Sequence, residues 1–429
     1  MSRSILAIAL VCCVQAAEFV PWTNGVPTQM AKGAFPEEKY RQYLLAPFDN
    51  KAFFPVFATQ PIHVGAEGVY PEITSAVIWH HGAAGNANSY FNDGVAVTRH
   101  YGIEKRILTA GPWFGKTEVT ASFWNSALPK GLKSIYWNGL TWVSGGGCVS
   151  DVGVQNCLSY GVLDAVVSQL KNHPSFPNMK RLSFAGFSAG CQLASRWSFF
   201  SSTLAPSEGD KVETQVVVAD CGTFMYVDER RPSASCRQPY NTGLEHTCTS
   251  FEKPDLPLAE YDKFKFGLYE ANPGREYSAS ELQALKEAFP KKGLRFLIGD
   301  QDACNCMSPT YNNPDYCFHP TLTCAPLNTA NPDVNSHCCD TFPDTFVHNV
   351  VDSSIAGLLQ GENRLQRMLN YMSYLKDVYQ DPFFPVIGVF EGGHNSTAFG
   401  YSPTFYDWVL SDKTGASASA SDSAKVLIM

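Results

Sequence analysis

Short apolar runs alternate with amphipathic segments along most of the sequence. Residues 73–80 and 106–111 are near-continuous apolar runs, which are typical of strands buried on both faces of a sheet. Residues 160–171 place apolar side chains three and four positions apart, as one face of a helix requires. Strands that alternate with helices at this spacing predict an α/β fold, with a mostly parallel central sheet covered by helices on both faces.

Several other segments of the chain do not follow this alternation of strands and helices. Residues 18–50 are rich in Pro and aromatic residues without a clear period, and we expect them to wrap the domain surface. Residues 223–290 interrupt the alternation as a candidate cap region, and residues 303–348 form a Cys-rich insertion. We expect one α/β domain over residues 17–412, followed by a disordered, Ala/Ser-rich tail at 413–429. Further strands are expected at 53–60, 62–66, 181–185, 212–219, 294–299 and 386–390, and further helices at 89–100, 189–200, 278–289 and 353–378.

The segment Gly186-Phe187-Ser188-Ala189-Gly190 follows a predicted strand and opens a predicted helix. Gly-x-Ser-x-Gly arises often by chance, but between a strand and a helix it predicts a nucleophile elbow. The glycines let the sharp turn pack against the flanking strand and helix, and the turn exposes the serine hydroxyl at the carboxyl end of the sheet. Ser188 is therefore the candidate nucleophile.

A serine hydroxyl needs a base to take its proton, and the base needs an acid to orient it. With an elbow of this kind the chain order is Ser, then Asp or Glu, then His. His394 is the last histidine of the chain and follows the last predicted strand, so it is the expected base. Asp300 and Asp302 close the preceding strand, and Asp220 ends an earlier one. We favour Asp302, because the acid must reach the imidazole from the loop beyond the strand, while Asp300 would fix the turn.

An acyl-transfer intermediate carries an oxyanion that needs N–H donors already in place. Residues 80–86 end a buried strand with small residues, so their backbone can approach the elbow. We expect the N–H groups of Ala83 and Ala189 to be these donors. This chemistry calls for no cofactor and no metal.

In these motifs the chain resembles secreted α/β-hydrolases, and in particular a group of esterase-like proteins of bacteria and fungi. The matching residues are 81–86, 90–91, 184–192, 299–302, 360–364, 367, 388–389 and 393–394. The resemblance spans residues 73–410 and implies an α/β-hydrolase fold and an esterase activity, with Asp302 as the acting acid. The chain departs from the pattern at Cys191, where a small Gly is usual, and in the insertion at 303–348.

The N-terminus is typical of a secretory signal peptide. Arg3 supplies a positive charge, residues 5–14 are apolar, and Val14-Gln15-Ala16 offers small residues for cleavage after Ala16. No later stretch is long enough to cross a membrane, so we expect a secreted protein without an integral membrane segment.

Twelve of the fourteen cysteines follow the predicted signal peptide, an even number that favours disulfides in an oxidising compartment. The Cys and His residues at 304–339 could hold zinc, but Cys304-Asn-Cys306 lacks the usual two-residue spacing, so we expect no metal there. We predict that one disulfide braces the elbow and that two others join cysteines close in sequence. The predicted pairs are Cys191–Cys221, Cys148–Cys157 and Cys236–Cys248.

The formal net charge of −8 argues against a nucleic-acid partner, which needs a basic surface. The sequence predicts a secreted serine hydrolase that cleaves a small-molecule or polymeric carboxylic ester through an acyl-enzyme. A peptidase or amidase on the same fold is the alternative, and a catalytically inactive binding protein is disfavoured because Ser, Asp and His occur in order. The aromatic residues at 113–142 could line an apolar pocket or pack the loops, and the sequence favours neither.

Overall fold

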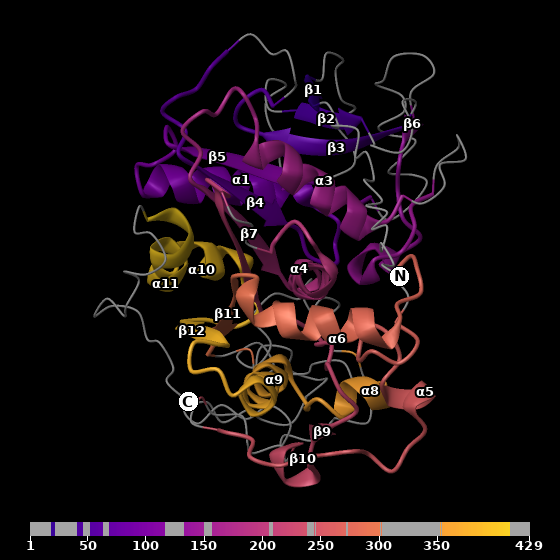
Figure 1. Ribbon diagram of the computed structural model, residues 1–429. Coiled ribbons are helices and arrows are strands. Elements are labelled where there is room, and N and C mark those ends of the chain that lie inside the picture. The colour runs from indigo at the N-terminus through magenta and orange to yellow at the C-terminus, as the bar shows by residue number, and fades with distance from the viewer. Residues whose placement is uncertain are drawn as a thin grey trace, which may run out of the picture.

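A computed structural model gives the structure of the chain (Figure 1). It describes residues 19–21, 41–45, 52–62, 68–115, 133–149, 157–205, 209–237, 244, 246–271, 273–300, 302, 352 and 354–411. The predicted signal peptide, the Cys-rich insertion, the C-terminal tail and most of the strand expected at 62–66 lie outside these residues.

Within the described residues, ten strands form one central sheet. Their order is β1-β2-β3-β5-β4-β7-β8-β11-β12, with β6 beside β3. The neighbours from β5 to β12 are all parallel, whereas β1–β2, β2–β3 and β3–β5 pair antiparallel. A mostly parallel sheet in which β4 and β5 exchange places is the arrangement of the α/β-hydrolase fold, as predicted. The strands are β1 (Phe19–Pro21), β2 (Arg41–Leu45), β3 (Ala52–Ala58), β4 (Ser75–His80), β5 (Ile107–Pro112), β6 (Lys133–Ser134), β7 (Arg181–Phe187), β8 (Glu213–Ala219), β11 (Leu294–Gly299) and β12 (Val386–Phe390).

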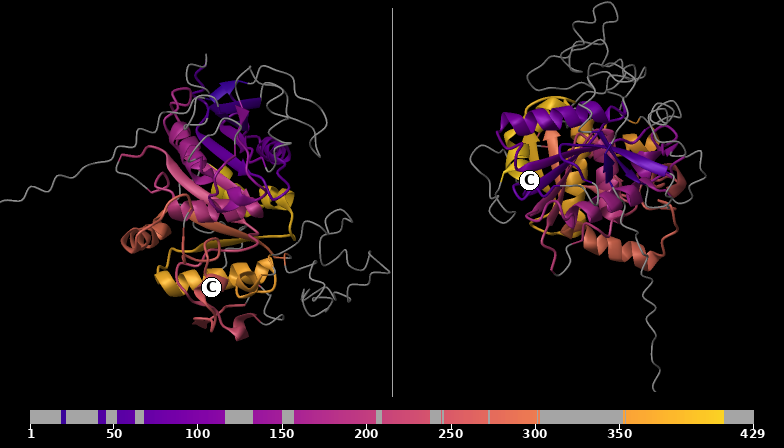
Figure 2. Two further views of the ribbon diagram at one scale, coloured as in Figure 1. Left: turned by 90° about the vertical axis from the view of Figure 1, so that its right-hand side faces the viewer. Right: turned by 90° about the horizontal axis from the view of Figure 1, so that it is seen from above.

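Helices cover both faces of this sheet. Helices α3, α4 and α9 lie over one face, and α1, α10 and α11 lie over the other, as their buried residues show. The view from above in Figure 2 shows α1 and α6 on opposite sides of the sheet. The helices are α1 (Ala87–His100), α3 (Ser159–Lys171), α4 (Ala189–Phe200), α5 (Leu258–Tyr261), α6 (Ala279–Ala288), α8 (Ile355–Leu358), α9 (Arg364–Tyr379), α10 (Ser396–Tyr401) and α11 (Pro403–Phe405), with single turns at η2 (Thr141–Ser144), η3 (Ala234–Arg237), η4 (Phe289–Lys291) and η6 (Tyr406–Leu410).

The two helical layers explain the continuous apolar run of β4. Ala76 and Ile78 belong to the core beneath α3 and α4, whereas Val77 and Trp79 belong to the core beneath α1 and α11. Successive side chains of a strand point to opposite faces, so a sheet covered on both sides requires apolar residues at every position. The ring of Trp79 packs 5.0 Å from that of Phe405 on the second face.

The N-terminal segment departs from expectation. Residues 19–21 and 41–45 form β1 and β2, which extend the sheet beyond β3 and do not merely wrap the surface. Neither run alternates strictly between apolar and polar residues, which is the pattern that identifies a half-buried strand in a sequence.

The candidate cap region holds the small β9–β10 sheet (Arg231–Pro232 and Phe251–Glu252) together with α5 and α6. The predicted capping box is present at the start of α6, where Ser278 and Glu281 bond reciprocally. A buried ion pair of 2.6 Å between Arg231 and Asp262 ties the region together. In this region α5 contacts α8 and β9 contacts α9, whereas α6 packs against α4. The elements of the candidate cap region all lie far from β1–β3 (Figure 1). Among the described helices, none has both the length and the apolar character needed to cross a bilayer.

Candidate active site

The predicted elbow joins β7 to α4, and Ser188 stands between them with φ 57° and ψ −118°. Two glycines make this turn sterically feasible. A Cβ on Gly186 would lie 2.6 Å from the carbonyl oxygen of Gly190, and a Cβ on Gly190 would lie 2.7 Å from that of His80. The Ser188 N–H donates to the carbonyl of Ala219 at the end of β8, at 3.1 Å. The elbow is therefore held rigidly at the carboxyl edge of the sheet, in the strained backbone expected of it.

Three side chains far apart in the sequence form a hydrogen-bonded chain at this edge. His394 lies in the turn between β12 and α10, with Nε2 2.9 Å from Ser188 Oγ. Its Nδ1 lies 2.9 Å from Asp302 Oδ2. An ionised carboxylate can only accept, so Nδ1 carries the proton and Nε2 is left to accept from the serine hydroxyl. The ring of Phe187 packs 4.7 Å from the imidazole and limits its movement.

Asp302 sits in a position that keeps its carboxylate charged. Its side chain is buried, and burial alone would raise the pKa of Asp302. The charges of His394 and Arg364, and their hydrogen bonds, outweigh burial and lower this pKa below its usual value. Arg364, at the first turn of α9, places Nη1 3.5 Å from Asp302 Oδ1, while Oδ2 faces the imidazole. The carboxylate is thus available as an acceptor for Nδ1–H.

Asp300 is directed elsewhere. Its Oδ1 accepts a hydrogen bond from the Gly392 N–H at 3.0 Å, and its own N–H donates to the carbonyl of Phe390. These bonds attach the turn after β11 to the turn that carries His394. The structure therefore brings Asp302 to the imidazole and places Asp300 as a brace between two turns.

The segment after β4 lies beside the elbow. A Cβ on Gly82 would lie 3.6 Å from Ser188 Cβ, and its other close neighbour is the Tyr90 hydroxyl. His81 fixes this segment, because its Nε2 accepts from the Phe114 N–H at 3.0 Å while Nδ1 lies 2.9 Å from the carbonyl of Gly82. Ala83 follows in this segment, and Ala189 is the first residue of α4, whose N–H cannot bond within its own helix. Ala189 thus directly follows Ser188, and Ala83 follows Gly82, the residue that lies beside Ser188.

From the sequence, the arginines at 364 and 367 are expected to lie on a helix and to make structural ion pairs, and Arg364 does form an ion pair, with Asp302 as the partner that the sequence did not name. This ion pair places Arg364 next to the carboxyl group that contacts His394. Arg367, one turn later, instead donates to the backbone carbonyls of Gly222, Gly361 and Asp352. The sequence contained one signal: the segment 360–364 is part of the resemblance to α/β-hydrolases.

Two of the three predicted disulfides are present. Cys191 in α4 bonds to Cys221 just after β8, and Cys236 bonds to Cys248 in the candidate cap region. The first disulfide ties the helix that follows Ser188 to the strand end that carries Asp220.

The third predicted disulfide is wrong, since Cys148 and Cys157 are free thiols. They are neighbours, because the Cys148 N–H donates to the carbonyl of Cys157 at 2.6 Å. A side-chain hydrogen bond with Cys148, together with burial, raises the pKa of the Cys157 thiol. Disulfide exchange proceeds through the thiolate, and the buried, hydrogen-bonded position of Cys157 disfavours its thiolate form.

The aromatic residues at 113–142 pack the core where they are described. Phe114 stacks on Trp142 at 5.3 Å and packs on Trp137 at 4.9 Å, and all three side chains are fully buried. They support the segment after β4, because the Trp142 ring lies 5.0 Å from that of His81. Phe123 and Trp124 lie outside the described residues. The described members of this group are core residues, which favours packing over a pocket lining.

Asp220, Asp302 and His394 bring one potential metal-ligand atom each within 4.8 Å of one another. Both ring nitrogens of His394 are engaged, however, one by Ser188 and the other by Asp302. The arrangement is thus better matched to proton transfer along a hydrogen-bonded chain than to coordination of a cation.

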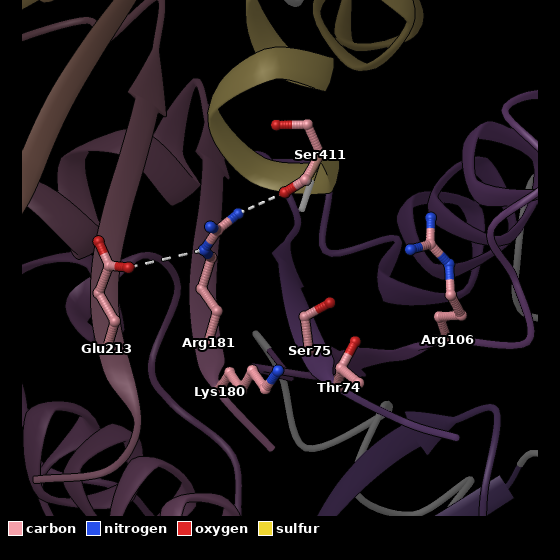
Figure 3. Close-up of a pocket in the computed structure, with 7 residues that line it drawn as sticks. All are labelled: Thr74, Ser75, Arg106, Lys180, Arg181, Glu213 and Ser411. Carbon is pink, nitrogen blue, oxygen red and sulfur yellow. Dashed lines mark hydrogen bonds and ion pairs between the residues drawn. The ribbon is translucent and has the colours of Figure 1, made fainter. Parts of the chain in front are cut away.

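A cavity of about 360 Å³ lies at the opposite edge of the sheet (Figure 3). It is lined by Thr74, Ser75, Arg106, Lys180, Arg181, Glu213 and Ser411. Most of these residues precede or begin β4, β5, β7 and β8, whereas Ser188 follows the carboxyl end of β7. Arg181 is engaged by the carbonyl of Ser411 at 2.7 Å and by Glu213 at 3.8 Å. This cavity is therefore separate from the hydrogen-bonded chain at the carboxyl edge.

No protein-family model matches the sequence, and no curated protein matches it. Among solved structures, a poly(3-hydroxybutyrate) depolymerase from Bordetella parapertussis is similar at 16% identity and a TM-score of 0.44, over 86% of this chain and 88% of that one. Poly(aspartic acid) hydrolase-1 from Sphingomonas sp. KT-1 is similar at 16% identity and a TM-score of 0.42, over 83% of this chain and 93% of that one. At this level of similarity neither structure bears on the substrate of this chain.

Proposed function

We propose that this protein is a serine hydrolase that cleaves carboxylic esters through an acyl-enzyme. The observation that carries the proposal is the continuous chain from Ser188 Oγ to His394 Nε2 and from His394 Nδ1 to Asp302 Oδ2, with both distances 2.9 Å. A nucleophile, a base and an orienting acid in direct contact are what nucleophilic catalysis by serine requires.

In the first half of the reaction, Ser188 Oγ attacks the ester carbonyl carbon while Nε2 of His394 takes the hydroxyl proton. The new C–O bond makes a tetrahedral intermediate, and the imidazolium then gives its proton to the departing alkoxide. In the second half, Nε2 takes a proton from water, which attacks the acyl-enzyme, and returns it to Ser188 Oγ as the acid leaves. Each half-reaction leaves the imidazole neutral again.

Asp302 serves both halves without exchanging a proton. It accepts from Nδ1–H, which fixes the tautomer with a free Nε2, and its charge stabilises the imidazolium. The ion pair with Arg364 supports the ionised form. The N–H groups of Ala83 and Ala189 are the proposed donors to the oxyanion, where one such donor contributes about 10²- to 10³-fold to the rate.

We also propose that the protein works outside the cell or in another oxidising compartment. The two disulfides, Cys191–Cys221 and Cys236–Cys248, support this, because cytosolic thiols are kept reduced. The signal peptide that the sequence predicts at residues 1–16 is consistent with the same location.

The experiment compares the purified protein with its Ser188→Ala variant on ester and amide substrates that share one acyl group. The series covers short and long acyl chains, aryl esters and a polymeric ester. We expect ester turnover in the wild type, loss of it in Ser188→Ala, and labelling of the wild type alone by a fluorophosphonate probe. Amide turnover that matches ester turnover would identify a peptidase or amidase.

Ser198→Ala is the matched control. Ser198 lies in α4, the helix that follows Ser188, is buried, and its hydroxyl donates only to the backbone of Ser195 among the described contacts. It should keep activity and label normally. A folded Ser188→Ala protein with the turnover of the wild type would overturn the proposal.

A further inference from the structure

Asp220 is a second buried carboxyl group beside the Asp302–His394 pair. It ends β8, is 1% exposed, and one of its oxygens lies within 4.8 Å of ligand atoms of both Asp302 and His394. Oδ1 accepts from the Gly299 N–H at 2.9 Å. Oδ2 is buried and has no hydrogen-bond partner among the described residues. A buried oxygen without a partner is costly, so the state of this group needs an explanation.

Two carboxylates within 4.8 Å of each other in a buried site repel, so ionisation of one raises the pKa of the other. The ionised form is better stabilised at Asp302 than at Asp220, because the imidazole and the Arg364 guanidinium both face Asp302. Asp220 has a single backbone N–H. Burial, followed by the charge of Asp302, raises the pKa of Asp220 well above its usual value. These surroundings favour the protonated form at Asp220 and the ionised form at Asp302.

We propose that Asp220 is a neutral carboxylic acid that carries its proton on Oδ2 and donates it to the Asp302 carboxylate, so that Asp220 acts as a positioning residue for the Ser188–His394–Asp302 chain. The donated hydrogen bond satisfies the otherwise unpartnered Oδ2 and fixes the carboxylate that orients His394. It does so without adding a second negative charge next to the imidazole. This role rests on the proposed serine hydrolase function, although the protonation state itself does not.

The other charged groups around Asp220 are consistent with a neutral acid. Asp300, in the turn after β11, adds negative charge and opposes ionisation of Asp220, while Arg364 from α9 favours it. Arg367, also from α9, donates to the carbonyl of Gly222 and so lies near the same strand end. Arg364 is already paired with Asp302, and Arg367 is already bonded to three carbonyls. Neither guanidinium contacts the Asp220 carboxyl in any described interaction.

The Asp220→Asn variant distinguishes a neutral Asp220 from an ionised one. An asparagine has the shape of the protonated acid, can accept from Gly299 N–H and can donate to Asp302. If Asp220 is neutral, this variant should keep kcat/KM within about threefold and should keep the acid limb of its pH profile within about 0.3 unit. If Asp220 is ionised, the substitution removes a negative charge close to the imidazole, and the acid limb should move to lower pH by about 1–3 units. The second result would overturn the proposal.

Infrared spectroscopy tests the proton without using activity. The difference spectrum of wild type minus Asp220→Asn, recorded at neutral pH, should contain the C=O band of a protonated carboxyl group, which shifts in heavy water. A difference spectrum with only carboxylate bands would refute the assignment. The same band should persist in Ser188→Ala, so failure of the proposed activity and failure of this inference are distinguishable.

Asp220→Leu removes the donor while keeping a neutral side chain of similar size. Loss of one hydrogen bond to a charged group should lower kcat by about 10- to 100-fold, with KM little changed. Circular dichroism and thermal melting show whether this variant folds. If it does not fold, Asp220→Asn and its infrared spectrum still decide the question.

Discussion

Exchange of Asp302 for asparagine should disable His394 by reversing its tautomer. In Asp302, Oδ1 lies 3.5 Å from Arg364 Nη1 and Oδ2 lies 2.9 Å from His394 Nδ1. The oxygen and the NH₂ group of the asparagine must take these two places. An NH₂ group opposite the guanidinium would set donor against donor, so the amide oxygen turns to Arg364 and the NH₂ group to the imidazole. Nδ1 must then accept, and the ring proton moves to Nε2, opposite Ser188.

With Nε2 protonated, His394 cannot take the serine proton. Loss of the correct tautomer at a triad aspartate costs about 10⁴-fold in kcat. This corresponds to about 5.4 kcal/mol of transition-state stabilisation. Because the oxyanion donors are unchanged, activity above that of water alone should persist.

The assay is kcat and KM on the best ester, with the concentration of folded protein taken from an active-site-independent measurement. Asp300→Asn is the matched control, since its Oδ1 accepts only the Gly392 N–H among the described contacts and an amide oxygen can replace it. It should keep kcat within about tenfold and lose about 0.5–1.5 kcal/mol of stability at most. Near-normal turnover in Asp302→Asn, together with a large loss in Asp300→Asn, would refute the reasoning.

Three further outcomes are expected. His394→Ala should lower kcat by about 10²- to 10⁴-fold, as loss of a general base does, and its melting temperature should show that the variant remains folded. A folded variant with normal activity would exclude His394 as the base. Gly190→Ala should lower the free energy of unfolding by about 1–3 kcal/mol and should also lower activity, because the new Cβ would lie 2.7 Å from the carbonyl oxygen of His80. A variant as stable as the wild type would show that this packing is looser than described. Peptide mapping without reduction should recover Cys191 linked to Cys221, and recovery of either as a free thiol would contradict the pairing.

Much of the fold could be predicted because its signals are local. The strands at residues 294–299 and 386–390 are β11 and β12 with the same bounds, since each is a short apolar run between turn residues. The start of α6 follows from Ser278 and Glu281 alone. The strain and the glycine contacts at the elbow also follow from five consecutive residues.

The features that were missed depend on contacts between distant segments. Arg364 reaches Asp302 only because the start of α9 docks against the turn after β11, where the Leu365 N–H donates to the carbonyl of Asp302 at 3.0 Å. No spacing in the sequence encodes that contact. Asp220 was one of three candidates for the acid and was not favoured, and a sequence does not reveal that one of its oxygens is buried without a partner among the described residues. The Cys148–Cys157 pair shows the converse: nearness along the chain predicted the contact correctly but not the bond.

The Cys191–Cys221 disulfide bears on how the protein must be produced. It joins the helix that follows Ser188 to the residue after Asp220, so it braces two parts of the site at once. Its closed loop spans 30 residues, for which chain entropy gives about 3–4 kcal/mol of stabilisation. Protein recovered from a reducing bacterial cytoplasm would lack that brace and would fold with a looser elbow. Inactivity of such a preparation would reflect the missing disulfide and would say nothing about the substrate. The protein therefore has to be expressed in the periplasm or refolded under oxidising conditions before substrates are tested.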